Sequence, residues 1–191
     1  MSKLWLIDAG YLFNARHSVE SQFRFNYKKL RDKLEEYGHL WRAYYLNSTP
    51  NPPTDQQDSF HSWLRCGPPH GPKIITKLYS LKPQQFQDAY CEECRETVSI
   101  ACPSGIDHNL INMQQKGVDV GLATLALVHK DKYDTLLLSS GDGDLLDAIE
   151  FISEQGKKIE LCVFKSAVST ELQSRADNIY WMNDFADNIR S

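Results

Sequence analysis

A short run of apolar residues at 133–140, YDTLLLSS, constrains the fold more than any other part of the sequence. Its leucines do not alternate with polar residues, so a strand built from them has to be covered on both faces, as in the centre of a parallel sheet. The turn sequence GDGD follows directly, and a helical pattern with Leu145, Ile149 and Ile152 comes next. A buried strand that passes through a tight turn into an amphipathic helix predicts an α/β fold.

Strands and helices alternate along most of the chain. Further strands are predicted at 3–8, 41–47, 73–81, 157–164 and 179–182. Further helices are predicted at 26–37, around 60–64, at 118–130 and after Ser169. Because parallel strands need crossover connections, this alternation predicts a doubly wound, mostly parallel central sheet.

Some stretches outside this pattern also carry expectations. Ala9 and Gly10 follow the first strand and predict a loop. The helix at 118–130 is apolar on more than one face, so we expect it to be buried on most sides. The acidic residues after the last strand are expected to form a loosely held tail. The tryptophans are expected to fill core positions, and they are Trp5, Trp41, Trp63 and Trp181.

The whole chain, residues 1–191, is interpreted as one domain with an insertion, because its length suits a single well-filled core. The insertion is placed at about 82–115, where hydrophobic periodicity is weak and three of the five cysteines gather. An odd number of cysteines, in a chain without an export signal, argues against a disulfide framework.

A possible zinc site lies within this insertion. Cys91, Cys94, Cys102 and His108 place three thiols and one imidazole within 18 positions. This composition suits tetrahedral Zn²⁺, which would pin a segment that has little core of its own. The alternative is three reduced cysteines without a ligand, and the sequence leaves both interpretations open.

Four aspartates lie at or near the ends of predicted strands. Asp8 ends the first strand, and Asp142 and Asp144 lie in the turn after 133–140. Asp119 opens the helix that precedes this strand. Ligands of open parallel sheets gather outside the carboxyl ends of the strands, so the four carboxylates are predicted to share one edge. A hard, oxygen-preferring ion such as Mg²⁺ or Mn²⁺ would relieve their repulsion.

Each aspartate also has a purely structural interpretation. Asp119 and Asp144 could be helix N-caps, and Asp142 could be a turn residue. Their arrangement at two strand ends and one adjoining helix start favours the metal site. Gly141 and Gly143 suit a tight turn that a ligand can approach closely.

Four motifs stand out: IDAGYLFNA, KGVDVGLATLAL, LLLSSGDGDLLDAIEFISEQGKKIELCVF and STELQSRADNIYWMND. They resemble the NYN domains, relatives of the PIN-domain ribonucleases, over the first strand and nearly everything after residue 114. The resemblance implies a three-layer PIN-like fold and metal-dependent cleavage of RNA phosphodiesters. It also implies that the catalytic, metal-binding acidic set consists of Asp8, Asp119, Asp142 and Asp144.

The sequence departs from the family pattern at two positions. Tyr11 stands where many relatives have Asn, although Asn14 lies nearby, and Leu125 stands where many have a further Asp. Six residues correspond to about 240° around a helix, so Leu125 need not share a face with Asp119. The loss of this carboxylate therefore trims the predicted site without emptying it.

An RNA partner would have to bind through a local patch, because a net charge of −4 gives no strong overall positive field. Residues 16–33 contain six basic residues and two acidic ones. The predicted substrate-binding residues are Asn14, Arg16, Lys28 and Lys29. The alternative is that these charges form a solvated helix face.

The leading functional hypothesis is a Mg²⁺- or Mn²⁺-dependent ribonuclease. Two hypotheses compete with it: a PIN-like module that binds RNA or protein without cutting, and a metal-dependent phosphatase or nucleotidase. No Walker loop, G-x-G-x-x-G or G-x-S-x-G motif supports another class of enzyme. The oligomeric state is left open between a monomer and a homo-oligomer.

The sequence also carries an expectation about location. No apolar run approaches the ~20 residues that are needed to cross a bilayer, so no membrane partner is expected. The N-terminal residues are too short an apolar run and too acidic for a secretory signal. The cytoplasm is therefore the expected compartment.

Overall fold

A six-stranded, fully parallel sheet forms the centre of the computed structural model, which describes residues 1–105 and 108–191. Its strands lie in the order β10-β9-β8-β1-β2-β3. They are β1 (Ser2–Asp8), β2 (His39–Thr49), β3 (Ile75–Ser80), β8 (Thr135–Ser139), β9 (Lys158–Val163) and β10 (Asn178–Trp181). The predicted parallel sheet and its central apolar strand are confirmed, because all five residues of β8 are buried.

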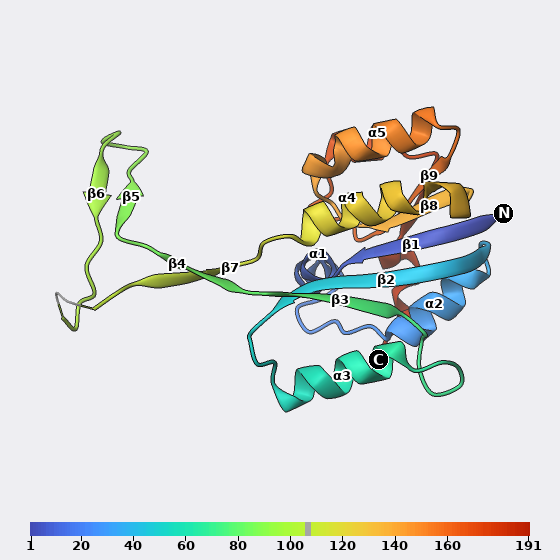
Figure 1. Ribbon diagram of the computed structural model, residues 1–191, viewed down its shortest axis with the longest axis horizontal. Coiled ribbons are helices and arrows are strands. Elements are labelled where there is room, and N and C mark those ends of the chain that lie inside the picture. The colour runs from blue at the N-terminus through green and yellow to red at the C-terminus, as the bar shows by residue number, and fades with distance from the viewer. Residues whose placement is uncertain (106–107) are drawn as a thin grey trace.

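Helices cover both faces of this sheet (Figure 1). One face carries α1 (Ala9–Ala15), α2 (Tyr27–Glu35), α3 (Asp55–Arg65) and α7 (Ala186–Ile189). The other face carries α4 (Val118–Val128), α5 (Leu146–Glu154) and α6 (Thr170–Arg175). Successive residues of β1 point to opposite cores: Leu4 and Leu6 pack under α4 and α5, and Trp5 and Ile7 pack under α1 and α2. The fold therefore has three layers, as predicted.

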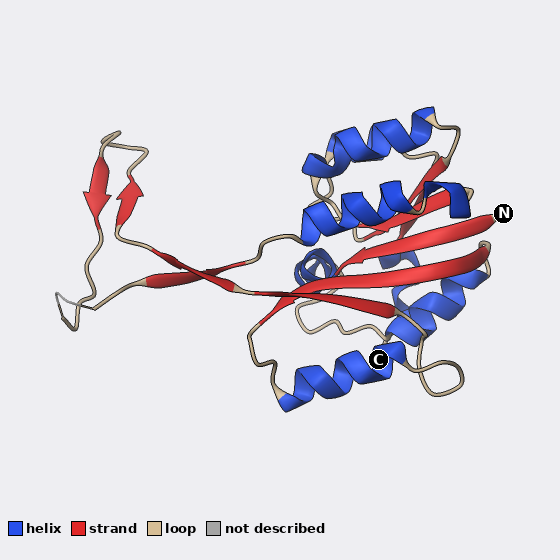
Figure 2. Cartoon of the chain, in the orientation of Figure 1, coloured by secondary structure: helices blue, strands red, loops and turns tan. Residues whose placement is uncertain are grey.

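The predicted insertion forms an arm that projects from one edge of the sheet (Figure 2). We call residues 82–114 the arm, as far as they are described. Its strands are β4 (Lys82–Gln85), β5 (Asp88–Tyr90), β6 (Thr97–Ser99) and β7 (Ile111–Gln114). β4 pairs with β7 and β5 pairs with β6, both antiparallel. None of the described arm residues belongs to either core cluster, so strand pairing and not a hydrophobic core organises most of this segment.

Three sequence-based expectations about secondary structure are wrong. The chain after Asp8 forms the helix α1 and not a loop, because Ala9, Leu12 and Ala15 are spaced to face the core. The acidic tail is not loosely held, because Ala186 is buried and Ile189 is fully buried. The end of the tail is also held in place, because the backbone amide of Asn26 donates a hydrogen bond to the Ile189 carbonyl at 2.8 Å.

The third correction concerns α4, which is not buried on most sides. Leu122 and Leu125 face the sheet, whereas Val120 is 71% exposed and Val128 is 70% exposed. The even distribution of apolar residues around this helix hid its orientation in the sequence. Among the described residues, no helix combines the length and the apolar character that a bilayer crossing requires.

The short helical turns η1 (Arg16–Ser18), η2 (Lys130–Lys132), η3 (Gly143–Leu145) and η4 (Met182–Phe185) complete the described elements.

One ion pair is nearly withdrawn from solvent: the Lys3 ammonium donates to the Glu160 carboxylate, and their side chains are 6% and 12% exposed. Lys3 lies on β1 and Glu160 on β9, so the pair reaches across β8.

We expect single replacements of this pair to be costly. Lys3→Met or Glu160→Met alone leaves one charge buried without its partner, which should cost about 3–5 kcal/mol of unfolding free energy. The double variant should lose much less, because neither charge remains. Urea unfolding measures all three, and Lys28→Met in the exposed Lys28–Asp32 pair is the matched control, with a loss of at most about 1 kcal/mol. Single variants as stable as this control would contradict the expectation.

Candidate metal centre

An open cavity of about 380 Å³ lies at the carboxyl ends of β1 and β8. The chain runs from β1 outward to β3 on one side and from β8 outward to β10 on the other, so this is the point where strand order reverses. We call it the acidic cavity. Its lining residues are Asp8, Gly10, Tyr11, Asn14, Gln115, Asp119, Gly141, Asp142 and Ala167. Three of the four predicted aspartates thus face one space.

Asp8 ends β1 and also caps α1. Its Oδ1 accepts a hydrogen bond from the Tyr11 amide at 3.0 Å, and its Oδ2 accepts one from the Ser140 hydroxyl at 3.2 Å. Burial raises the pKa of Asp8 above the usual carboxyl value. These two hydrogen bonds oppose the increase, and the negative charge of Asp119 adds to it. The carboxylate is therefore held in one orientation while its charge is incompletely stabilised.

Asp119 and Asp142 bring two further carboxylates to the cavity from the first turn of α4 and the turn after β8. Desolvation raises the pKa of Asp119, and the charges of Asp142 and then Asp144 raise it further. The Asp142 amide donates to the Ser140 hydroxyl oxygen at 3.3 Å. Ser140 therefore links Asp8 and Asp142 through one side chain.

Asp144 has a different position from the other three. Asp144 is exposed, as Asp119 is, but unlike Asp119 it does not line the acidic cavity. Its amide donates to Asp142 Oδ1 at 3.0 Å, so Asp142 caps the short helix that contains Asp144. The charge of Asp144 still contributes to the raised pKa of Asp119. Asp144 is therefore close to the acidic cavity without lining it.

The turn between β8 and η3 requires a glycine at 141. A Cβ atom there would lie 1.8 Å from the Ala167 carbonyl oxygen and 2.7 Å from the Tyr11 ring. The Ser169 amide also donates to the Gly141 carbonyl at 2.9 Å. The missing side chain therefore lets the loop after β9 close one side of the acidic cavity.

The donor chemistry of the acidic cavity fits a hard divalent cation. Three carboxylates with two raised pKa values repel one another, and a cation would offset that repulsion. Within the described ranges, no three His, Cys, Asp or Glu side chains lie close enough to hold one ion together. Mg²⁺ tolerates such a site, because it keeps several waters and takes only one or two carboxylates directly.

The two positions that depart from the family pattern have different roles. Leu125 is 6% exposed in the core between α4 and the sheet and does not line the cavity. Tyr11 lines the cavity, and its hydroxyl lies 3.1 Å from the Phe164 carbonyl oxygen and 3.2 Å from that of Ser166. Tyr11 thus holds the loop after β9, and Asn14 supplies an amide at the rim.

The predicted basic substrate-binding residues do not gather at this cavity. Lys28 is paired with Asp32 at 2.8 Å, and Lys29 donates to the Arg190 carbonyl at 2.7 Å. Arg16 lines a second cavity on the other side of α1. Gln115 lines the acidic cavity but was not predicted, because it lies in a stretch without periodicity, at the base of the arm.

The cysteines and His108 are found as two separate pairs. Cys91 and Cys94 lie in the turn between β5 and β6. The Cys94 backbone amide and, to a smaller extent, its thiol form hydrogen bonds to the Cys91 sulfur that lower the pKa of Cys91. Cys102 lies beyond the other end of β6, with its sulfur 3.4 Å from His108 Nδ1. The structure does not bring the four together, and the zinc site stays a prediction.

Comparisons with known proteins agree with this architecture. A search of curated proteins finds no match. The fold is similar to the crystal structure of a protein of unknown function from Vibrio parahaemolyticus, with a TM-score of 0.68 and 20% sequence identity. That similarity covers 100% of this chain and 96% of the other, and it concerns the fold alone.

The sequence itself is matched by a family model. The model describes the NYN domain and matches residues 5–183, which include the second half of β1, the acidic cavity and the arm. This match covers nearly the whole chain and contains every predicted aspartate. The chain therefore belongs to the NYN domain family.

Proposed function

We propose that this protein is a Mg²⁺- or Mn²⁺-dependent endoribonuclease that hydrolyses RNA phosphodiester bonds at the acidic cavity. The observation that carries the proposal is that Asp8, Asp119 and Asp142, from three separate elements, line one cavity where strand order reverses. Membership of the NYN family supports a nuclease and an RNA substrate.

Asp8, Asp119 and Asp142 would hold the divalent ion, directly or through water. When bound, such an ion lowers the pKa of a coordinated water and stabilises negative charge on the reacting phosphate. Asp8 is preorganised for this role by the Tyr11 amide and the Ser140 hydroxyl. Asn14 and Gln115 offer amide donors at the same cavity, where they can orient a phosphate oxygen.

The position of Leu125 bears on the competing hypothesis of a module that does not cut. Its side chain packs into the core, so a carboxylate at this position would not reach the acidic cavity from the present helix orientation. The departure from the family pattern is thus compatible with a working site. The set of carboxylates that can serve is Asp8, Asp119 and Asp142, with Asp144 outside it.

Metal binding should raise the thermal stability of the protein. Saturating Mn²⁺ or Mg²⁺ at a hundredfold excess over the dissociation constant adds about 2.7 kcal/mol, or roughly 5–10 °C in Tm for a chain of this size. Asp8→Asn should remove most of this shift, and the exposed Asp131→Asn should keep it. Differential scanning calorimetry with EDTA and with metal measures the response. An equal shift in Asp8→Asn and the parent would count against the site.

The proposed activity predicts cleavage of single-stranded RNA with Mn²⁺ or Mg²⁺ and none with EDTA. Asp142→Asn should lower the rate by at least about a hundredfold, the scale of one lost transition-state-stabilising group. RNA affinity should stay nearly unchanged, since basic side chains supply most of it. Asp144→Asn is the matched control, with a loss of at most about tenfold, because its side chain does not line the acidic cavity.

Gel analysis of end-labelled RNA measures this cleavage, and hydrolysis of p-nitrophenyl phosphate is tested in parallel. RNA that binds but stays intact with both metals would support the non-cutting module. Hydrolysis of the small ester with intact RNA would support the phosphatase.

Leu125→Asp should destabilise the protein without raising activity. It buries a carboxylate among leucines and removes apolar contacts, which we expect to cost about 3–5 kcal/mol. Val120→Asp, on the solvent side of the same helix, is the control and should change stability by at most about 0.5 kcal/mol. Chemical denaturation and the RNA assay check both. A stable Leu125→Asp variant that cuts faster would show that this position belongs to the site.

A further inference from the structure

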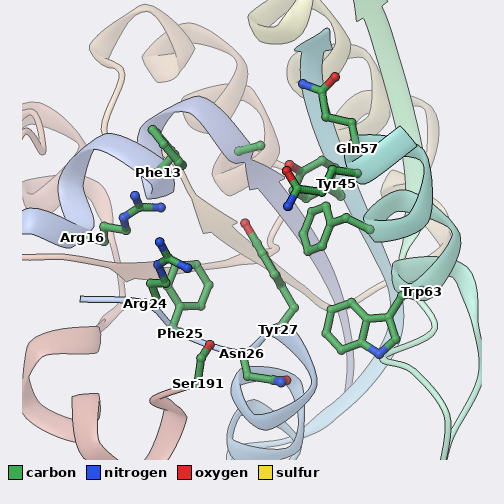
Figure 3. A pocket seen from close by; sticks show the side chains of 13 residues that line it. Phe13, Arg16, Arg24, Phe25, Asn26, Tyr27, Tyr45, Gln57, Trp63 and Ser191 are labelled. Atoms are coloured by element: carbon green, nitrogen blue, oxygen red, sulfur yellow. The ribbon is translucent and has the colours of Figure 1, made fainter. Parts of the chain in front are cut away.

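A second, larger cavity of about 680 Å³ lies on the opposite side of α1 from the acidic cavity. We call it the aromatic cavity, and its principal lining residues are Arg16, Arg24, Tyr27, Tyr45, Phe60 and Trp63. Figure 3 shows Arg16 and Arg24 together on one side, Trp63 on the other and Tyr27 between them. Its volume falls within the range of about 300–1,000 Å³ that is usual for small-molecule sites.

The aromatic rings form a connected wall. The Phe60 ring lies 5.9 Å from the rings of Tyr27, Tyr45 and Trp63, measured between centroids. The residues come from α2, β2 and α3, which pack on the same face of the sheet. Phe60 and Trp63 are only partly buried and line the cavity, so part of each side chain is open to a ligand there.

The basic side of the cavity has unsatisfied charge. Arg16 Nε is buried and has no hydrogen-bond partner among the described residues, although its guanidinium stacks 3.9 Å from the centre of the Phe13 ring. Neither Arg16 nor Arg24 forms an ion pair within residues 1–105 and 108–191, and no acidic residue lines the cavity. This part of the surface therefore attracts an anion.

The two cavities share one helix. Ala9 and Phe13 of α1, and Arg16 directly after it, line the aromatic cavity, whereas Gly10 and Asn14 of α1 line the acidic one. Tyr45 lies beside Ile7 in the pairing of β1 with β2, one residue before Asp8. The aromatic wall therefore lies next to the strand end that carries the Asp8 carboxylate.

We infer that the aromatic cavity binds an unpaired nucleotide of single-stranded RNA next to the bond that is cut, with its base against Phe60 and Trp63 and a phosphate at Arg16 and Arg24. The inference rests on the proposed function and specifies its substrate class. Aromatic faces accept any base by stacking, and arginines neutralise the adjacent phosphates. Bases within a duplex are stacked on one another and cannot enter, so the cavity favours single strands.

Binding is tested without cleavage, in EDTA, with the whole chain and a short single-stranded RNA that carries one 2-aminopurine. Stacking should quench the 2-aminopurine fluorescence. The same RNA annealed to its complement should bind at least about tenfold more weakly. Trp63→Ala should also weaken single-strand binding by about tenfold, the scale of one lost base–aromatic stack, and abolish the quenching. Trp41→Ala is the matched control, because Trp41 lies at the His129 ring, away from this cavity.

A second variant keeps the test decisive if Trp63→Ala folds poorly. Arg24→Glu changes an exposed side chain, and it should weaken single-strand binding and lower its salt dependence, whereas Arg42→Glu should not. Equal affinity for single strand and duplex, or unchanged binding in both variants, would overturn the inference and leave the cavity to an apolar peptide. Cleavage with no effect of these variants would refute only this inference, and quenched binding without cleavage would refute only the proposed nuclease activity.

Discussion

Backbone pairing between β1 and β8 fixes the geometry on which both the fold and the acidic cavity depend. Lys3 lies beside Thr135 and Ile7 beside Ser139, and the Trp5 indole donates to the Ser139 hydroxyl at 2.9 Å. This pairing ends at Ile7 and Ser139, and the next residue of each strand is Asp8 and Ser140. Although these two residues are 132 positions apart in the sequence, the Ser140 hydroxyl donates a hydrogen bond to the Asp8 carboxylate. The acidic cavity is a direct consequence of this register, since a slip of one residue would turn these side chains to the opposite face.

Along the central strands, the apolar residues that stabilise the fold come first, and the residues that line the acidic cavity follow at the carboxyl ends. From Leu4 to Ile7 both faces of β1 are covered by apolar side chains, and the carboxylate of Asp8 follows directly. Raised pKa values at Asp8 and Asp119 mean that burial opposes their charged forms. Apolar packing in the two core clusters offsets the free-energy cost of burying these carboxylates, as is usual where a stable scaffold holds a destabilising site.

The sequence predicted the parts that depend on local pattern. The parallel sheet, its helices other than α1 and α7, and the convergence of Asp8, Asp119 and Asp142 follow from apolar runs that end in acidic turns. Contacts between distant segments that do not lie at the strand ends were not predictable. The aromatic cavity combines residues from α1, α2, β2 and α3, and Trp63 was expected to fill the core although it lines this cavity. The basic pattern at 16–33 also hid that Lys28 and Lys29 are engaged by neighbouring groups.

The arm leaves the sheet after β3 and returns immediately before α4, with Lys82 paired to Gln114 at its base. Because both ends are anchored at this pairing, the segment beyond it can change in length or composition with little effect on the folding of the sheet; doubling a closed loop costs only about 0.6 kcal/mol. Gln115, the first residue after the arm, lines the acidic cavity. Insertions and replacements in the arm can therefore change the surface beside the acidic cavity while the sheet that carries this cavity stays the same.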